Sequence, residues 1–442
     1  MRRILTIAIV IFGLLSTHDL AAHNREKARA EVLAGSRGFY KDLFMDSGIA
    51  LTSRRHLPAT RFLGMSLEYF ASASKSKLTE RDTLLQNKIF CGDENDTNGW
   101  LLYPDGAPRF RAIYVNGGSA SKHARSLGDG GRERIREYVA NGGAYVGTCA
   151  GAFIASAGGM DNKGKAHYSD IYLKLWPGYA HRTMLKKSST TLRLEKGCPL
   201  YKYFDFGKER LVTDVRHNGG CYAHESPANS LPTSTEPLAR YIFDNTDKVK
   251  IDNEISVWAY KPTEESGRAI LCGSHPEGIA DGEQLEFMAA MLLYAMDGNP
   301  APKIKATLKE GEVREMNKRT EDNDPAYTRI GDRQYHHFAL DVPKKCKQLI
   351  IKLDDYEDAK KFDLTLCAKR GEMAFHDNTL TKSVSSGCKK TLTIDCPKSG
   401  QWFVSVFCET TVETSTGKYG TSYRGRTSVL NGVPYKISIE YK

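Results

Sequence analysis

The feature that most constrains the fold is the stretch GGAYVGTCAGAFIAS, residues 142–156. A short apolar run is followed directly by small residues in a helical pattern, so a strand must turn into a helix within a few residues. Such a turn needs small flanking residues, here Gly147 and Gly151, around the residue at its tip, Cys149. Two interpretations of Cys149 follow: a nucleophile presented on the turn, or a small buried residue of the kind common at glycine turns.

Strand-like and helix-like patterns alternate over residues 38–297. Predicted strands are 110–115, 144–147, 254–260 and 268–273, and predicted helices lie within 132–143 and 281–298. Strands that alternate with helices favour a parallel sheet covered on both faces. We therefore predict an α/β domain over residues 23–297, with a mainly parallel, doubly wound (flavodoxin-like) sheet and a nucleophile elbow.

The rest of the chain has a different pattern. Residues 298–330 are polar and highly charged, and we interpret them as a partly ordered linker. From residue 331 onward, apolar and polar residues alternate, as in YKISIEY (435–441). Short strands separated by Gly, Pro and Ser predict an all-β sandwich over residues 331–442.

The first residues have the plan of a signal peptide. A basic start is followed by an apolar stretch from Ile4 to Leu15 and by small residues before His23. We predict that residues 1–22 are cleaved and that the protein is secreted or periplasmic; an uncleaved anchor is the alternative. The apolar stretch is shorter than the roughly 20 residues of a membrane span. We therefore expect no transmembrane segment in the mature chain.

Cysteine content and charge narrow the function further. Ten cysteines fit an oxidising compartment, so we expect disulfides, whose connectivity the sequence leaves open. No paired C-x-x-C segments are present, and we expect no metal. The net charge is +10, but Lys and Arg are spread along the chain without a nucleic-acid-binding motif. We expect no nucleic-acid partner.

The turn has partners for thiol chemistry elsewhere in the sequence. A thiolate nucleophile needs a base and a group that orients the base. His275 follows an apolar strand in the segment LCGSHPEG, with Glu277 two residues on. The rival base is His217 in VRHNGG, which could instead line a pocket or a turn.

The segments GGAYVGTCAGAFIAS and GSHPEG together resemble the class I glutamine amidotransferase superfamily, and in particular its biotin-protein ligase N-terminal-like branch. The resemblance spans about residues 38–297. It implies that Cys149 is the nucleophile, that His275 is the general base and acid, and that Glu277 orients the imidazole. An elbow of this kind places the backbone amide of the next residue, Ala150, where an oxyanion forms.

Two further segments resemble loops of the superfamily, and a third is a candidate pocket segment. The loop in YVNGGSASKH resembles the one that supplies the second oxyanion amide, which the resemblance assigns to Gly117 and Gly118. The predicted pocket residues are Asn116 from this loop, His217, Asn218 and Gly219 from HNGG, and Asp46 from YKDLFMDSG. Each segment could also be an ordinary turn, and Asp42 and Asp46 could line one face of a helix end.

The tail resembles the C-terminal β-sandwich of the pre-peptidase type. Its segments YHHFALDVP, FDLTLCAKRG, GQWFVSV and YKISIEY occur in the expected order. The resemblance implies contact with a polymer or a cell surface through residues 331–442. A stabilising spacer without a ligand is the alternative.

The sequence lacks the parts of a synthetase. It has no G-x-x-x-x-G-K-[ST] loop, and its C-terminal part is β-patterned rather than similar to a biotin-ligase catalytic domain. We therefore predict an exported cysteine hydrolase that cleaves a small-molecule or peptide amide, or a related acyl bond, without a synthetase partner, metal or organic cofactor. The alternatives are a catalytically idle ligand-binding protein on the same fold and an adhesive protein in which the sandwich carries the function.

Overall fold

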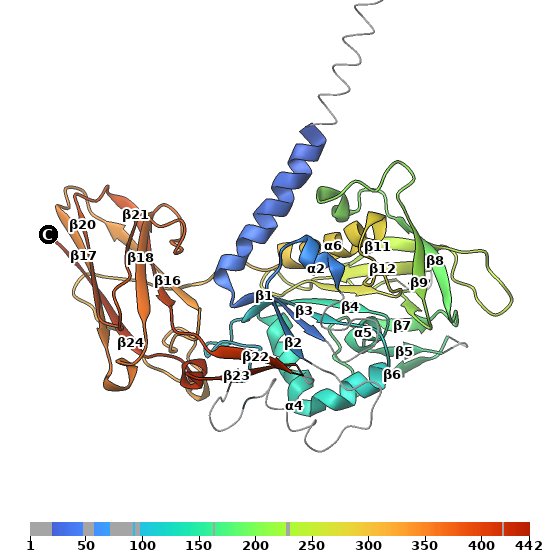
Figure 1. Ribbon diagram of the computed structural model, residues 1–442, viewed down its shortest axis with the longest axis horizontal. Helices are drawn as coiled ribbons and strands as arrows, with labels where there is room; N and C mark the ends of the chain where they lie inside the picture. Colours follow the sequence, from blue (N-terminus) through green and yellow to red (C-terminus); the bar gives the residue numbers. More distant parts are fainter. Residues whose placement is uncertain are drawn as a thin grey trace, which may run out of the picture.

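A computed structural model describes residues 20–46, 57–70, 92, 98–161, 164–226, 230–417 and 420–442 of the chain. An α/β part with one large sheet lies beside a β-rich part made from the C-terminal residues (Figure 1). Most of the predicted signal peptide lies outside the described residues, and residues 20–34 are helical. No described helix is both long enough and apolar enough to span a membrane.

The large sheet has eleven described strands in the order β22-β23-β2-β1-β3-β4-β13-β12-β11-β8-β9. Its five parallel strands are β2 (Leu67–Phe70), β1 (Lys41–Asp46), β3 (Phe110–Val115), β4 (Ala144–Thr148) and β13 (Ala269–Cys272). The antiparallel strands are β12 (Ile255–Tyr260), β11 (Thr235–Ile242), β8 (Ser188–Leu194), β9 (Leu211–His217), β22 (Glu413–Gly417) and β23 (Gly420–Arg424).

The sheet is therefore mixed, and the predicted doubly wound, mainly parallel arrangement is not confirmed. The reason lies in the connections. Residues 261–268 join β12 to β13 without a helix. A connection this short permits an antiparallel hairpin but not a parallel crossover, which needs a dozen or more residues. Sequence patterns showed these strands but not their direction.

Helices cover both faces of the parallel strands. On one face lie α4 (Ala120–Ala140) and α5 (Ala150–Ala155), and on the other lie α2 (Pro58–Phe62) and α6 (Gly282–Asp297) (Figure 1). The period-two geometry of a strand divides the core accordingly. Tyr145 of β4 packs in the cluster with α4 and α5, whereas Ala144 and Val146 pack in the cluster with α6.

A small four-stranded sheet follows the elbow. Its order is β10-β7-β5-β6, and its strands are β5 (Gly158–Met160), β6 (Ala166–Tyr168), β7 (Tyr179–Arg182) and β10 (Cys221–Tyr222). The turn between β9 and β10 thus links the large sheet to the small one. This link brings residues 217–221 next to the end of β13, where the backbones of Arg216 and His275 form an isolated bridge.

The C-terminal part contains two sheets that share a core. The first has β14 (Ile304–Thr307), β16 (Tyr335–Val342), β21 (Gly400–Cys408), β18 (Leu364–Arg370) and β19 (Thr381–Ser383). The second has β15 (Arg314–Met316), β24 (Tyr435–Tyr441), β17 (Gln348–Asp355) and β20 (Lys390–Asp395). Phe338, Val404, Leu349 and Ile437 from the two sheets pack in one cluster.

Two segments cross the boundary expected from the sequence. Strands β14 and β15 come from residues 298–330, the expected linker, and pair with β16 and β24. Strands β22 and β23 come from the tail but join the large sheet, where β23 pairs with the edge strand β2. The C-terminal residues therefore contribute strands both to the sandwich and to the large sheet of the α/β part.

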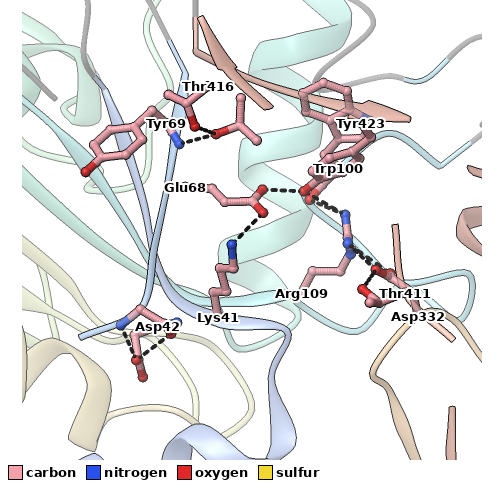
Figure 2. Close-up of polar contacts among 12 residues, drawn as sticks. Lys41, Asp42, Glu68, Tyr69, Trp100, Arg109, Asp332, Thr411, Thr416 and Tyr423 are labelled. Carbon is pink, nitrogen blue, oxygen red and sulfur yellow. Dashed lines mark hydrogen bonds and ion pairs between the residues drawn. The ribbon is translucent and has the colours of Figure 1, made fainter. Parts of the chain in front are cut away.

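A buried ion pair joins the two parts (Figure 2). Arg109 Nη2 contacts both carboxylate oxygens of Asp332 at 2.9 and 3.0 Å, and each side chain is 1% exposed. Arg109 also donates to the Tyr423 hydroxyl at 3.3 Å, and that hydroxyl donates to Glu68 at 2.5 Å. Glu68 in turn pairs with Lys41 at 2.9 Å. The network connects strands β1 and β2 with the β22–β23 hairpin, which carries Tyr423, and with the sandwich, which carries Asp332.

Replacing one member of this network should destabilise the whole chain. We expect Arg109→Met to lower the free energy of unfolding by about 3–5 kcal/mol, because buried Asp332 would lose its oppositely charged partner and keep, among the described residues, only the hydrogen bond from Thr411. The double variant Arg109→Met/Asp332→Leu should lose less free energy of unfolding, because no buried charge is left unpaired. Urea denaturation measures both, with Lys352→Met as the control, since its exposed pair with Glu440 is worth under about 1 kcal/mol. Equal losses for Arg109→Met and Lys352→Met would contradict this view.

Candidate active site

The residue at the tip of the elbow has a strained backbone. Cys149 has φ 48° and ψ −103°, and it separates β4 from α5 with no intervening loop. Its amide donates to the carbonyl of Cys272 on the neighbouring strand at 2.8 Å. A non-glycine residue with positive φ costs free energy and persists only where its surroundings impose it. Here the tertiary structure holds the thiol at the carboxyl ends of the parallel strands.

Two glycines allow the elbow to pack. A Cβ on Gly151 would lie 2.0 Å from the carbonyl oxygen of Val115 in β3. A Cβ on Gly147 would lie 2.5 Å from the carbonyl carbon of Gly151. Neither position has room for a side chain, because a backbone lies directly against it. The G-x-C-x-G pattern is thus explained by the contact of α5 with β3.

The structure brings Cys149, His275 and Glu277 together from two adjacent strand ends. His275 Nδ1 lies 2.9 Å from Glu277 Oε1, which leaves the other ring nitrogen for Cys149. Burial lowers the pKa of His275, but hydrogen bonds with Cys149 and Glu277 and their negative charges outweigh it and raise the pKa to about 10. The three residues are only 4%, 5% and 2% exposed. The imidazole is therefore set to carry a positive charge beside the sulfur.

Two buried hydroxyl groups support Glu277. Thr148 Oγ1 donates to Glu277 Oε1 at 3.3 Å, and the hydroxyl of Tyr114 lies 3.0 Å from Thr148 Oγ1. Neither residue was predicted from the sequence. Thr148 stands inside the G-x-C-x-G pattern, so its hydroxyl was a visible signal. Tyr114 was hidden inside an apolar strand run.

The predicted oxyanion loop lies against the cluster. A Cβ on Gly117 would lie 2.3 Å from His275 Cε1 and 3.4 Å from Cys149 Cβ. Gly118 has φ 133°, a conformation that favours glycine. Ala150 is the first residue of α5, a position whose amide has no acceptor inside the helix. Asn116, at the end of β3, is fully buried.

The close fit of Gly117 can be tested. We expect Gly117→Ala to displace the imidazole of His275 and to slow iodoacetamide labelling of Cys149 about tenfold or more, since small displacements are costly in a positioned site. Gly278→Ala is the matched control, because nothing lies within 4 Å of a Cβ at that position. Mass spectrometry of labelled peptides measures the rates. An unchanged rate in Gly117→Ala would show that the imidazole does not occupy this place.

His217 lies beside the cluster but has other partners. Its Nδ1 lies 2.9 Å from Ser274 Oγ, and its Nε2 lies 2.7 Å from Thr183 Oγ1 and accepts from the amide of Gly220 at 3.2 Å. Burial and the charge of His275 lower its pKa to about 4. His217 is thus a neutral residue that holds the β9–β10 turn, and it has no free nitrogen for Cys149.

The other residues of the predicted HNGG loop contribute backbone groups. The carbonyl oxygen of Asn218 lies 4.0 Å from the Cys149 sulfur, whereas its side chain is exposed and accepts from the amide of Lys187 at 3.2 Å. The amide of Gly219 donates to the carbonyl of Leu185 at 2.6 Å. The turn therefore covers the sulfur with main chain.

The segment around Asp46 forms a strand, not the helix end that we considered. Asp46 is the last residue of β1, at the same edge of the sheet as the elbow, and its side chain lies outside the described part. Asp42 is buried away from the cluster. It accepts from the amide and hydroxyl of Ser66 at 2.9 and 2.8 Å and from the hydroxyl of Ser36 at 2.5 Å. Asp42 has a structural role.

Because His217 is neutral in the native state, the stability of the protein should depend on pH. Its pKa falls from 6.5 to about 4 on folding, so the unfolded chain takes up the proton first as the pH falls. The native state should lose up to about 3 kcal/mol between pH 6.5 and 4 through this residue. His217→Gln should show a shallower loss over that range in urea denaturation, compared with the exposed control His23→Gln. Parallel curves for the two variants would contradict the burial of a neutral His217.

The described cysteines differ from the sequence expectation. Nine cysteines have free thiols: Cys149, Cys198, Cys221, Cys272, Cys346, Cys367, Cys388, Cys396 and Cys408. Cys91 lies outside the described residues, so the expected disulfides are absent from the described part of the chain. Seven of these nine thiols are buried, and four of the seven lie in the separate strands β10, β13, β18 and β21. No group of three or more His, Cys, Asp or Glu among the described residues is arranged to hold a metal.

A known protein family matches the part of the chain that contains the elbow. Residues 107–319 match the family model for the N-terminal part of biotin-protein ligase. This match supports a relation to the class I glutamine amidotransferase-like superfamily, and it covers the elbow, the His275 segment and the β9–β10 turn. No curated protein matches the chain.

Three solved structures show limited similarity. A glutamine amidotransferase is 16% identical over 57% of this chain and 98% of its own, with a TM-score of 0.31. PurLQS from Thermotoga maritima is 14% identical over 57% and 98%, with a TM-score of 0.34. The pre-peptidase C-terminal domain of a Bacillus anthracis collagenase is 10% identical over 32% and 99%, with a TM-score of 0.19. Similarity at this level carries no information on activity or substrate.

Proposed function

We propose that the chain is a cysteine hydrolase on an amidotransferase-like fold, which cleaves an amide or a related acyl bond. The observation that carries the proposal is the arrangement at the elbow. A thiol on a strained strand-to-helix turn lies beside an imidazole whose other nitrogen is 2.9 Å from a buried carboxylate. A nucleophile, a base and a group that orients the base are the parts that covalent acyl transfer requires.

The reaction would proceed in two steps. The Cys149 thiolate attacks the acyl carbon, and the resulting oxyanion is stabilised by the amide of Ala150 and by the Gly117–Gly118 loop. The His275 imidazolium gives its proton to the leaving amine, and a thioester remains on the sulfur. Neutral His275 then takes a proton from water, whose oxygen attacks the thioester carbon. The carboxylic acid leaves and the thiol is restored.

Glu277 and its neighbours orient the base in this scheme. The carboxylate stabilises the imidazolium and fixes which ring nitrogen faces the sulfur. Thr148 and Tyr114 hold the carboxylate through their hydroxyl groups. No step in this scheme needs a synthetase partner.

A second candidate is a ligand-binding protein in which the cluster is idle. The observation in its favour is the low exposure of Cys149, together with the main chain of Asn218 that lies over the sulfur. Both features limit the access of a substrate to the thiol. The two candidates differ in whether the thiol is activated.

Export and surface contact complete the proposal. The predicted signal peptide would place the hydrolase outside the cytoplasm, and the sandwich would hold it at a polymer or a cell surface. Both ideas rest on the sequence alone. The adhesive function remains the weaker alternative for residues 331–442.

The rate of alkylation measures whether the thiol of Cys149 is activated. We expect iodoacetamide to label Cys149 near neutral pH, because the raised pKa of His275 keeps the imidazolium charged well above pH 7 and so favours the thiolate. In the His275→Ala variant, labelling should need a more alkaline pH and be about tenfold or more slower at pH 7. Peptide mass spectrometry identifies the labelled cysteine.

Two controls complete this test. The Cys149→Ser variant should lose only the fast label, and Cys396, which is exposed and distant in the sequence, should label at the same rate in every variant. A Cys149 that labels no faster than Cys396, with or without His275, would refute the hydrolase and favour the idle binding protein.

A further inference from the structure

Exposed cations lie on segments whose main chain borders the cysteine–histidine–glutamate cluster. They lie on two segments: residues 182–187, which lead from β7 to β8, and residues 214–219, which end β9 and turn toward β10. The cationic residues on these segments are Arg182, Lys186, Lys187 and Arg216, and all four are exposed. The two segments are separate in the sequence, and the fold brings them side by side.

Backbone contacts tie two of these cations to the cluster. The carbonyl of Arg216 accepts from the amide of His275 at 2.9 Å. The amide of Lys187 donates to the side chain of Asn218 at 3.2 Å, and the carbonyl of Asn218 lies 4.0 Å from the Cys149 sulfur. The main chain of Arg216 thus contacts the base, and that of Lys187 contacts the residue whose carbonyl lies over the nucleophile.

The two segments are joined along their length. The amide of Thr183 donates to the carbonyl of Gly220 at 3.0 Å, and the amide of Gly219 donates to the carbonyl of Leu185 at 2.6 Å. Strands β7 and β10 continue this pairing, with Arg182 opposite Cys221. The cations are therefore carried on one hydrogen-bonded platform rather than on independent loops.

The positive charge of this platform is largely uncompensated. Within the described part of the chain, none of the four cations forms an ion pair, and the two segments contain one carboxylate, Asp214. His217 adds no charge, because burial and His275 lower its pKa to about 4. Uncompensated charge around a buried reaction site attracts anions and raises their local concentration.

We propose that the substrate of this site carries an anionic group, a carboxylate or a phosphate, next to the bond that is cleaved. Arg216 and Lys187 bind the anion, and Arg182 and Lys186 add to the field. This inference rests on the proposed hydrolase function and adds the substrate class to it. An uncharged amide would leave the platform without a partner.

A pair of alkylating agents tests the proposal without a known substrate. Iodoacetate and iodoacetamide are similar in size and differ in charge, so the ratio of their rates at Cys149 reports the local field. We expect this ratio to be several-fold higher in the folded chain than in the urea-unfolded chain. Arg216→Gln and Lys186→Gln/Lys187→Gln should each lower it about threefold to tenfold, and added salt should lower it as well.

The matched control is Lys344→Gln, an exposed lysine in the sandwich turn between β16 and β17. It should leave the rate ratio unchanged. A ratio equal to that of the unfolded chain, or one that Arg216→Gln does not lower, would overturn the proposal. Iodoacetamide rates that do not depend on His275 would instead count against the hydrolase function, so the two failures are distinguishable.

A binding measurement covers a chain in which the thiol is inert. Isothermal titration calorimetry on the Cys149→Ser protein would compare succinate, inorganic phosphate and neutral succinamide. We expect succinate or phosphate to bind and succinamide not to bind, and the stronger of the two anions identifies the group. Equal binding of succinate and succinamide, or anion binding that survives the triple variant Lys186→Gln/Lys187→Gln/Arg216→Gln, would refute the anion site.

Discussion

The close approach of α5 to β3 determines the geometry of the site. Gly151 lies directly against the carbonyl of Val115, and this contact lets the chain turn from β4 into α5 without a loop. The turn forces positive φ on Cys149, and the same edge of the sheet presents the segment that follows β13. A larger residue at position 151 would push the helix away and separate the sulfur from the imidazole. One backbone contact therefore sets the position of the whole cluster.

Much of this site could be predicted from local sequence, because its parts are short segments with strict requirements. The elbow needs glycines on both sides of Cys149, and His275 and Glu277 stand two residues apart, so their contact is local. Tyr114 could not be predicted, because its hydroxyl acts from within a buried strand whose pattern is apolar. His217 was the rival to His275 as the base in the sequence. Only its contacts with Ser274 and Thr183 give it a structural role.

Strand direction and long-range pairing were the parts of the fold that the sequence did not determine. The run 254–260 is strand-like in either direction, and the short connection to β13 decides that the pair is antiparallel. The gathering of Arg182 and Arg216 was hidden for a similar reason. Lys and Arg are spread along the sequence, and the two cationic segments come together only once β7 pairs with β10 and β9 pairs with β8. The distribution of Lys and Arg along the sequence therefore does not show how they are distributed on the surface of the folded chain.

The hairpin β22–β23 has a consequence for how the chain can be divided. It supplies two strands to the large sheet and covers the edge of β2, while the residues before and after it belong to the sandwich. A chain shortened at residue 330 would expose the backbone donors and acceptors of β2, which can pair with other chains. The C-terminal residues thus protect an edge of the large sheet through this hairpin, and a loss of surface binding in a shortened chain could reflect aggregation rather than the loss of a binding surface.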